Sequence, residues 1–395
     1  MSFGRRTDRL RSEGAYQVLA RAQELEAKGL DIIHLEIGEP DFATPGNVCL
    51  TGIRAIAEGR TRYNPPAGLS SLREIIADTA GKKRGIRISP KQVVVGPGAK
   101  PGLFFPTLAL VDPGDQVVYP NPGFPTYEAM IGVAGGTPVP VPLVESNSFS
   151  FDLKNFDRLV NERTRLIILN SPSNPTGGVI PLADLEHIAK VAQRYDCWVL
   201  SDEIYGQIAF DGLAVPSIAS LPGMAERTII VDGFSKTYAM TGWRLGFSIM
   251  PEPLAERTGL LLTHSIGCTA HFTQIAGVEA LTGPQEQVAA MVAEYQRRRD
   301  IIVDGLNGLP GIHCLKPQGA FYAFPNIQKT NKSSGELANL MLDGGVAVLP
   351  GSAFGEYGEG YLRIVFANSV ENIKRALERM ENVLKRAVYE KTTSA

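Results

Sequence analysis

Unbroken runs of valine, isoleucine and leucine alternate with helix-forming segments between about residue 46 and residue 283. The apolar runs predict strands at residues 92–95, 116–118, 138–141, 165–169, 197–201, 228–232 and 245–249. Helices are expected between them, for example at residues 69–84, 99–111 and 124–134. Strands that read as continuous apolar runs are buried on both faces, as in parallel sheets covered by helices. We therefore expect an α/β fold whose large domain, residues 46–283, holds a mixed but mostly parallel sheet between helices.

Residues 284–395 show a different pattern. They open with an amphipathic segment, which predicts a long helix over residues 285–306 with Arg297, Arg298 and Arg299 on its solvated side. Short strands are expected near residues 313, 320–324, 346–349 and 361–365, and a closing helix near residues 370–387. Strands interleaved with helices at this scale predict a smaller α+β domain.

The first 45 residues precede both patterns. Helix formers fill residues 15–28 and stop at Gly29, a usual position for a helix C-cap. A short strand is expected at residues 32–37. We therefore treat residues 1–45 as an amino-terminal arm.

The composition is typical of a soluble globular protein. Of 395 residues, 44% are hydrophobic and 20% are charged, and the net charge is −2. The 39 basic and 41 acidic residues are interspersed without a basic run, which argues against a nucleic-acid partner. No apolar segment approaches the roughly 18 residues of a membrane helix, and no apolar stretch follows the first arginines as in a signal peptide. We expect a cytoplasmic protein without a membrane partner.

Cysteine and histidine are spaced too widely for a disulfide framework or a zinc site, so we expect no metal. The scattered residues are Cys49, Cys197, Cys268, Cys314, His34, His187, His264, His271 and His313.

Two strand ends carry the candidate chemistry. Asp202 closes one apolar run, Lys236 closes the next, and Arg244 follows eight residues later. The carboxyl edge of an open α/β sheet is where ligands bind. A lysine among apolar residues and near another cation has its ammonium form destabilised, so its neutral amine can form a Schiff base. A carboxylate for a ring nitrogen and an arginine for a phosphate complete the set that predicts a pyridoxal 5'-phosphate site.

The chain resembles the fold-type I aminotransferases of class I and II, in particular the prokaryotic aspartate aminotransferase subgroup. The resemblance rests on blocks in one order at residues 38–42, 63–68, 174–177, 201–205, 235–236 and 242–244 and on Arg363. These blocks span nearly the whole chain. The resemblance implies a large cofactor domain and a smaller α+β domain with which the amino-terminal arm packs.

The resemblance implies three catalytic residues, Lys236, Asp202 and Tyr205, and a binding role for Asn174 beside them. Lys236 is the lysine of the internal aldimine and the base that moves the substrate proton. Asp202 holds the pyridinium nitrogen protonated, so that the ring becomes an electron sink. Tyr205 and Asn174 donate hydrogen bonds to the phenolic oxygen of the cofactor.

The phosphate contacts are expected from backbone amides and a cation. The amides of Ala99 and Lys100 lie at a predicted helix N-terminus, where anions bind, and Arg244 supplies a bidentate cation. Many relatives carry a serine where this chain has Gly233, which leaves open whether Ser235 reaches the phosphate.

Two aromatic residues complete the cofactor site that the resemblance implies. Phe124 stacks on the ring. Tyr63 reaches the phosphate of the neighbouring subunit, which implies a homodimer with shared active sites.

The resemblance places Gly38, Asn174 and Arg363 around the substrate, with Arg363 binding its α-carboxylate. Lys100 matches a lysine that meets the distal carboxylate of an acidic substrate. Glu13, however, stands roughly where those relatives carry a serine. A glutamate there either neutralises Lys100 or favours a less acidic substrate, and the segment at residues 266–271 also departs from the usual pattern.

The expected activity is amino transfer between an L-amino acid, with aspartate or glutamate as one option, and a 2-oxo acid in a ping-pong mechanism. A carbon–sulfur lyase or a similar lyase of the same fold is the first alternative, because it uses the same lysine and aspartate. A non-enzymatic regulator with this fold needs a helix-turn-helix segment, and only about 45 residues precede the first sheet motif. A dinucleotide-binding oxidoreductase is disfavoured because no Gly-x-Gly-x-x-Gly follows a strand.

Overall fold

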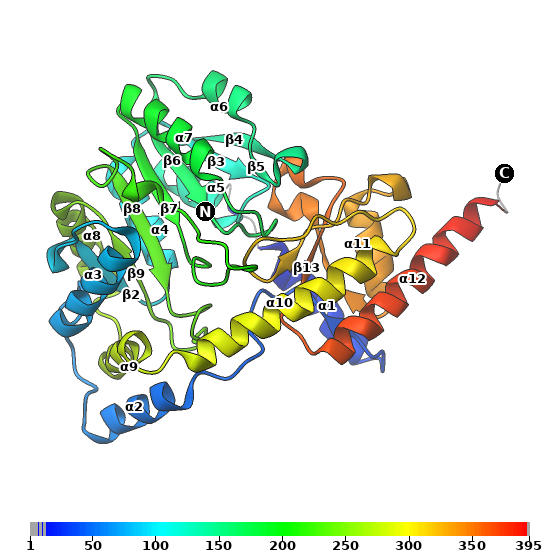
Figure 1. Ribbon diagram of the computed structural model, residues 1–395, viewed down its shortest axis with the longest axis horizontal. Helices are drawn as coiled ribbons and strands as arrows, with labels where there is room; N and C mark the ends of the chain where they lie inside the picture. The colour runs from blue at the N-terminus through cyan, green and yellow to red at the C-terminus, as the bar shows by residue number, and fades with distance from the viewer. Residues whose placement is uncertain (1–6, 8–9, 11–12, 393–395) are drawn as a thin grey trace, which may run out of the picture.

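The computed structural model describes residue 7, residue 10 and residues 13–392, and it is built around an eight-stranded sheet (Figure 1). The strand order is β2-β9-β8-β7-β6-β3-β4-β5. Strand β9 runs antiparallel to both of its neighbours, and β5 runs antiparallel to β4, while the others share one direction. The sheet is therefore mixed and mostly parallel, as predicted. The strands are β2 (Val93–Gly96), β3 (Gln116–Asn121), β4 (Thr137–Val144), β5 (Ser150–Phe151), β6 (Thr164–Asn170), β7 (Trp198–Asp202), β8 (Thr228–Gly233) and β9 (Gly246–Ile249).

Helices cover both faces of this sheet, and the alternation of side chains along one strand shows why its sequence is wholly apolar. In β6, Leu166 and Ile168 pack with α4, α5 and α8, whereas Ile167 and Leu169 pack with α7 on the opposite face. Successive strand residues point to opposite faces, so both sets are buried. The helices around the sheet are α2 (Gly46–Ala57), α3 (Ser70–Arg84), α4 (Lys100–Leu110), α5 (Thr126–Ala134), α6 (Leu153–Leu159), α7 (Leu182–Arg194), α8 (Glu252–Ser265) and α9 (His271–Thr282).

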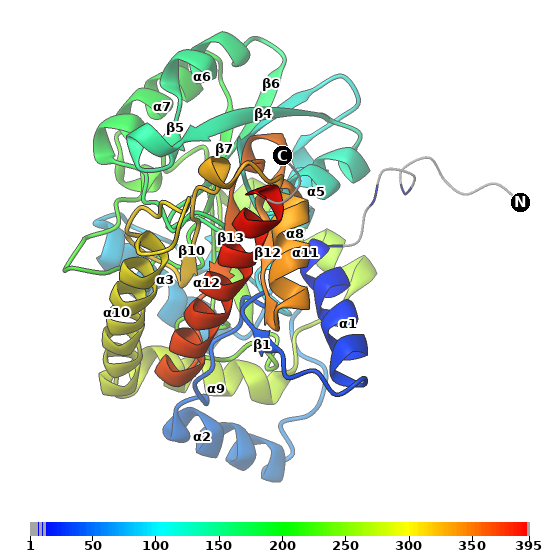
Figure 2. The ribbon, with the colours of Figure 1, turned by 90° about the vertical axis from the view of Figure 1, so that its right-hand side faces the viewer.

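The remaining elements form a second layered unit beside the sheet, in which α10 and α12 lie side by side in both views (Figures 1 and 2). Its core joins apolar residues of α10, α11 and α12 to the short strands β10 and β13. Strand β1 of the amino-terminal arm pairs in parallel with β11, so the arm packs with this unit. The domain boundaries near residues 45 and 283 stay a prediction. The elements are α1 (Gly14–Glu26), β1 (Ile33–His34), α10 (Glu286–Asn307), β10 (Tyr322–Ala323), α11 (Ser334–Asp343), β11 (Val346–Ala347), β12 (Leu349–Pro350), β13 (Leu362–Val365) and α12 (Val370–Thr392).

The prediction that three consecutive arginines of α10 face solvent is wrong for two of them. Arg298 is 7% exposed and Arg299 is fully buried, whereas the Arg297 side chain is exposed. Arg299 donates to both carboxylate oxygens of Asp211, at 2.6 and 3.0 Å. Consecutive helical residues lie about 100° apart, so three in a row span too wide an arc to share one solvated side.

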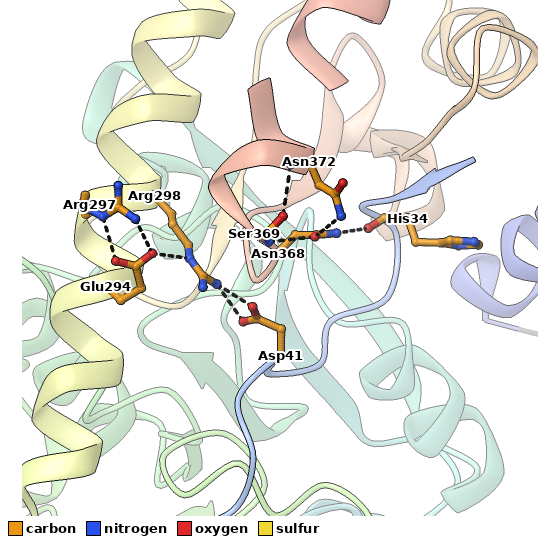
Figure 3. A network of polar contacts seen from close by, with 8 residues as sticks. All are labelled: His34, Asp41, Glu294, Arg297, Arg298, Asn368, Ser369 and Asn372. Carbon is orange, nitrogen blue, oxygen red and sulfur yellow. Dashed lines mark hydrogen bonds and ion pairs between the residues drawn. The ribbon is translucent and has the colours of Figure 1, made fainter. Parts of the chain in front are cut away.

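Two polar contacts fasten the amino-terminal arm to the second unit (Figure 3). Arg298 Nη1 donates to both carboxylate oxygens of Asp41 at 2.8 Å, and its Nε donates to Glu294 at 2.8 Å. Asn368, just before α12, donates to the backbone oxygen of His34 at 3.0 Å. The buried arginine is thus paired, which offsets its loss of hydration.

Within the described part of the chain, no helix is long and apolar enough to cross a membrane.

Candidate active site

A cavity of about 560 Å³ opens at the carboxyl edge of the sheet, where β7 ends at Asp202 and the loop after β8 carries Lys236. Parallel strands deliver their carboxyl ends to one edge, which explains why residues far apart in sequence meet here. Of the residues predicted to bind cofactor or substrate, all but Tyr63 line this cavity. They are Gly38, Ala99, Lys100, Phe124, Asn174, Asp202, Tyr205, Ser235, Lys236, Arg244 and Arg363.

The side chain of Lys236 lines the cavity, and a hydrogen bond fixes its amino group there. Its Nζ donates to the backbone oxygen of Gly38 at 2.6 Å and lies 5.7 Å from the centre of the Phe321 ring. Burial lowers the pKa of Lys236 to about 8, Glu39 opposes that shift, and the nearby guanidinium groups of Arg363 and Arg244 add to it. The neutral amine is therefore accessible near neutral pH, as Schiff-base chemistry requires.

Asp202 is a buried carboxylate at the end of β7, 5% exposed. Its Oδ2 accepts from the Tyr127 hydroxyl at 2.7 Å and its Oδ1 accepts from the amide of Ile204 at 3.3 Å. Burial raises the pKa of Asp202 to about 6. No lysine or arginine among the described residues lies within 4.0 Å of this carboxylate, so it fits a cationic ring nitrogen placed in the cavity.

Tyr127 is a site residue that the sequence reasoning missed. It is fully buried, it lines the cavity, and its hydroxyl donates to Asp202. Tyr127 lies in the first turn of α5, three positions after Phe124, which precedes the helix, and the two rings pack edge-on with centroids 5.8 Å apart. Because Phe124 lies outside the helix, no helical spacing in the sequence marks Tyr127 as a partner of this site.

The segment between β2 and α4 forms a cradle for an anion. Gly98 has a φ of +90°, and a Cβ there would lie 2.4 Å from Nη2 of Arg244. Arg244 donates to the backbone oxygen of Thr241 at 2.8 Å, and Ala99 caps the N-terminus of α4. Helix N-terminal amides facing a guanidinium suit a phosphate.

Gly233, where the resemblance led us to expect a serine, lies in tight packing between β8 and β9. A Cβ at Gly233 would lie 3.1 Å from Cα of Gly246 and 3.2 Å from Cδ1 of Ile204. A serine there would require these neighbours to move. Ser235 lines the cavity, and its contact with a phosphate stays a prediction.

Arg363, on β13, is fixed from several sides at the other end of the cavity. It is 4% exposed and its guanidinium lies 4.8 Å from the ring centres of both Tyr322 and Phe354. It donates to Oδ1 of Asn174 at 3.1 Å and to the backbone oxygen of Glu36. A guanidinium held this way presents a preformed site for a carboxylate.

Tyr322 also lines the cavity and was not predicted from the sequence. Its hydroxyl lies 2.5 Å from that of Tyr205, and it would lie 2.3 Å from a Cβ at Gly38, so only glycine fits there. Nothing in the local pattern of β10 marks this tyrosine, because its partners come from β13 and from loops more than 100 residues away.

The two residues that bear on specificity and assembly lie at the periphery. Lys100 Nζ donates to Oε1 of Glu13 at 2.5 Å, so Glu13 neutralises it, which is one of the two outcomes expected from the sequence. Tyr63 is 96% exposed and lies outside the cavity. Its predicted contact with a neighbouring subunit stays a prediction.

Comparisons with known proteins point the same way as the geometry. The family model for aminotransferase class I and II matches residues 30–380. An aspartate aminotransferase of Pyrococcus abyssi is 43% identical over 90% of this chain and 92% of its own length. The aromatic-amino-acid aminotransferase 2 of Thermococcus litoralis is 42% identical over 91% and 93%. Among solved structures, the aspartate aminotransferase of Thermus thermophilus with maleate has a TM-score of 0.92 at 35% identity, covering 97% of this chain and 100% of that one.

Proposed function

The chain belongs to the class I and II aminotransferases, and from that premise we propose that it exchanges amino groups between an L-amino acid and a 2-oxo acid in a ping-pong mechanism. Its cofactor is pyridoxal 5'-phosphate, which the family uses. One observation carries the proposal: Asp202 and Lys236 face the same cavity, one a buried carboxylate without a cation partner among the described residues, the other a lysine with its pKa lowered to about 8. Bound pyridoxal phosphate supplies an electron sink for the electrons released at the substrate Cα.

Lys236 is proposed as the base. Its Nζ accepts the proton that leaves the substrate Cα and later donates it, which requires a pKa near the working pH. The shift of its pKa to about 8 provides this. The Gly38 carbonyl, its partner at 2.6 Å, directs the amine.

Asp202 is proposed to hold a proton on the ring nitrogen by accepting its hydrogen bond. The Tyr127 hydroxyl fixes the orientation of the carboxylate. Asn174 accepts from Arg363 through Oδ1, which leaves its amide protons for the phenolic oxygen of the cofactor. Tyr205 lines the same wall and supplies the second donor.

Arg363 is proposed to bind the substrate α-carboxylate, with Gly38 allowing close approach of the backbone. Ala99, Lys100, Ser235 and Arg244 are proposed to bind the phosphate. Arg244 and Arg363 are already held by hydrogen bonds within the protein. Binding therefore loses little side-chain conformational entropy.

We propose an acidic amino acid, aspartate or glutamate, as one of the two substrates, with Lys100 meeting its distal carboxylate. The position of Lys100 in the cavity wall supports this. So do the names of relatives, which include both aspartate and aromatic aminotransferases. Lyase activity is not favoured, because the relatives are named as aminotransferases.

A homodimer with shared sites is also proposed. Helix α2 presents Leu50, Ile53 and Ile56 to solvent, with exposed fractions of 64%, 63% and 50%, and Tyr63 follows this helix. Apolar side chains gathered on one exposed helix suit a protein interface. The expected cytoplasmic location stays a prediction.

A panel of amino donors with 2-oxoglutarate tests the activity. Amino transfer yields two exchanged products and parallel lines in double-reciprocal plots. Release of ammonia and a 2-oxo acid without any acceptor would instead establish a lyase.

A further inference from the structure

The ion pair between Glu13 and Lys100 closes one side of the cavity mouth. Glu13 directly precedes α1 and Lys100 begins α4, so two segments 87 positions apart meet here. The Lys100 side chain is 53% exposed and that of Glu13 is 28% exposed. Lys100 Nζ also lies 5.4 Å from the ring centre of Phe124. The pair therefore borders both solvent and the space where a substrate side chain would lie.

A ping-pong aminotransferase binds two different side chains in turn at one site. If the Lys100 ammonium had no counter-ion, an apolar substrate side chain beside it would bind unfavourably. An unpaired Glu13 carboxylate would likewise disfavour an acidic substrate side chain beside it. A closed pair has no net charge, and apolar and aromatic residues are among those that line the same cavity. These residues are Ala15, Tyr16, Ile37 and Leu103.

The exposure of the pair makes it easy to open. Ion pairs this exposed shift an equilibrium by no more than about fivefold. A hydrogen bond between an ammonium and a substrate carboxylate in a partly enclosed site is stronger, on the order of tenfold or more. An acidic substrate can therefore take Lys100 from Glu13, whose partly exposed carboxylate turns to water.

We propose that Glu13 is an exchangeable counter-ion for Lys100, which lets one site accept an acidic substrate in one half-reaction and a substrate with an uncharged, largely apolar side chain in the other. The pair stays closed with the uncharged side chain and opens for the acidic one. This inference rests on the proposed aminotransferase function and makes Glu13 a specificity-determining residue.

Binding of two unreactive ligands to the cofactor-loaded protein tests the exchange, measured by calorimetry. Succinate represents the acidic class and 3-phenylpropionate the uncharged class. Glu13→Gln should tighten succinate binding about three- to fivefold and weaken 3-phenylpropionate binding about twofold, because Lys100 loses its counter-ion. Lys100→Met should weaken succinate binding about tenfold or more.

The double variant, Glu13→Gln with Lys100→Met, distinguishes exchange from a general change of shape. It should bind 3-phenylpropionate as the parent does and bind succinate as weakly as Lys100→Met alone. Asp78→Asn is the matched control, since it breaks the pair that Lys82 Nζ makes with Asp78 at 2.7 Å, away from the cavity. It should leave both affinities unchanged.

An unchanged ratio of the two affinities in Glu13→Gln would overturn the counter-ion role. The same holds if both ligands weaken together in that variant. Failure of the proposed function looks different: the parent would transfer no amino group from any donor, although its ligand ratio still responded to Glu13→Gln.

Discussion

The inner wall of the cavity, formed by Asp202, Tyr127 and Arg363, differs in burial from its mouth, formed by Tyr16, Glu13 and Lys100. Asp202, Tyr127 and Arg363 lie within 5% exposure, and each is fixed by hydrogen bonds or rings on several sides. At the mouth, Tyr16 is 61% exposed and Lys100 is held by an exposed ion pair. Burial shifts pKa values and fixes geometry, whereas exposure leaves contacts exchangeable. The comparison fits the proposal that the reaction takes place at the inner wall and that the mouth selects the substrate.

The largest expected effect tests the inner wall directly. Lys236→Ala should lower turnover by about 10⁴-fold, because general base catalysis is lost, and should remove the borohydride-reducible bond to the cofactor. Circular dichroism should remain that of the parent. Lys83→Ala is the control, since Lys83 Nζ also donates to a backbone oxygen, that of Gly206, at 3.1 Å. A reducible bond that survives in Lys236→Ala would exclude this lysine.

Asp202→Asn should lower the half-reaction rate by about 10³-fold, near 4 kcal/mol of transition-state stabilisation. Asp232→Asn is a matched control, because Asp232 is also a buried carboxylate at a strand end with its pKa raised to about 6. Asp232 does not line the cavity, so its variant should stay within about tenfold of the parent. An equal loss of half-reaction rate in Asp202→Asn and Asp232→Asn would contradict a contact between Asp202 and the ring nitrogen.

The raised pKa of Asp202 also predicts a pH dependence of stability in the cofactor-free protein. Its folded-state pKa of about 6 lies above the ordinary 3.8, so the folded state favours the protonated carboxyl. The resulting stabilisation is complete below pH 3.8 and is lost as pH rises through about 6. The free energy of unfolding of the parent in urea, relative to that of Asp202→Asn, should fall by about 2 kcal/mol between pH 4 and pH 7. If the free energies of unfolding of the parent and of Asp202→Asn changed in parallel with pH, burial would not raise the pKa of Asp202.

Tyr127→Phe should have the smallest effect of this series, a loss of about tenfold or less in the half-reaction rate, the value of one hydrogen bond to a charged group. The variant keeps the ring and its packing. Tyr119→Phe serves as the control, since it removes the hydroxyl that donates to Glu128 at 3.2 Å, outside the cavity. A loss no larger than that of Tyr119→Phe would show that Tyr127 only packs.

The same division between inner wall and periphery explains what the sequence could predict. The strands were predictable because burial on both faces leaves a continuous apolar run, and Asp202 and Lys236 stood out as ionisable residues at the ends of such runs. Tyr127 and Tyr322 act through partners that only the tertiary structure brings close. The prediction that Arg299 faces solvent was wrong for a related reason.

Arg299 is buried because a carboxylate on a distant loop pairs with it, Asp211 lying 88 positions earlier. A helical pattern reports which face is apolar, and it carries no information on a charge compensated from elsewhere in the chain. Glu13 and Lys100 show the opposite case, since both were noticed in the sequence through the resemblance, and the structure supplied the contact between them.

The antiparallel strand β9 has a consequence for the order in which the chain assembles during synthesis. Strand β2 joins the sheet through β9, which begins 150 positions later at Gly246. The cradle at Ala99 and Lys100, which follows β2, therefore meets Arg244 only once the ribosome has passed residue 249. Arg363 arrives more than a hundred residues after that. A ligand that needs both arginines can stabilise only a nearly finished chain, and its binding then favours the molecules that have completed the sheet.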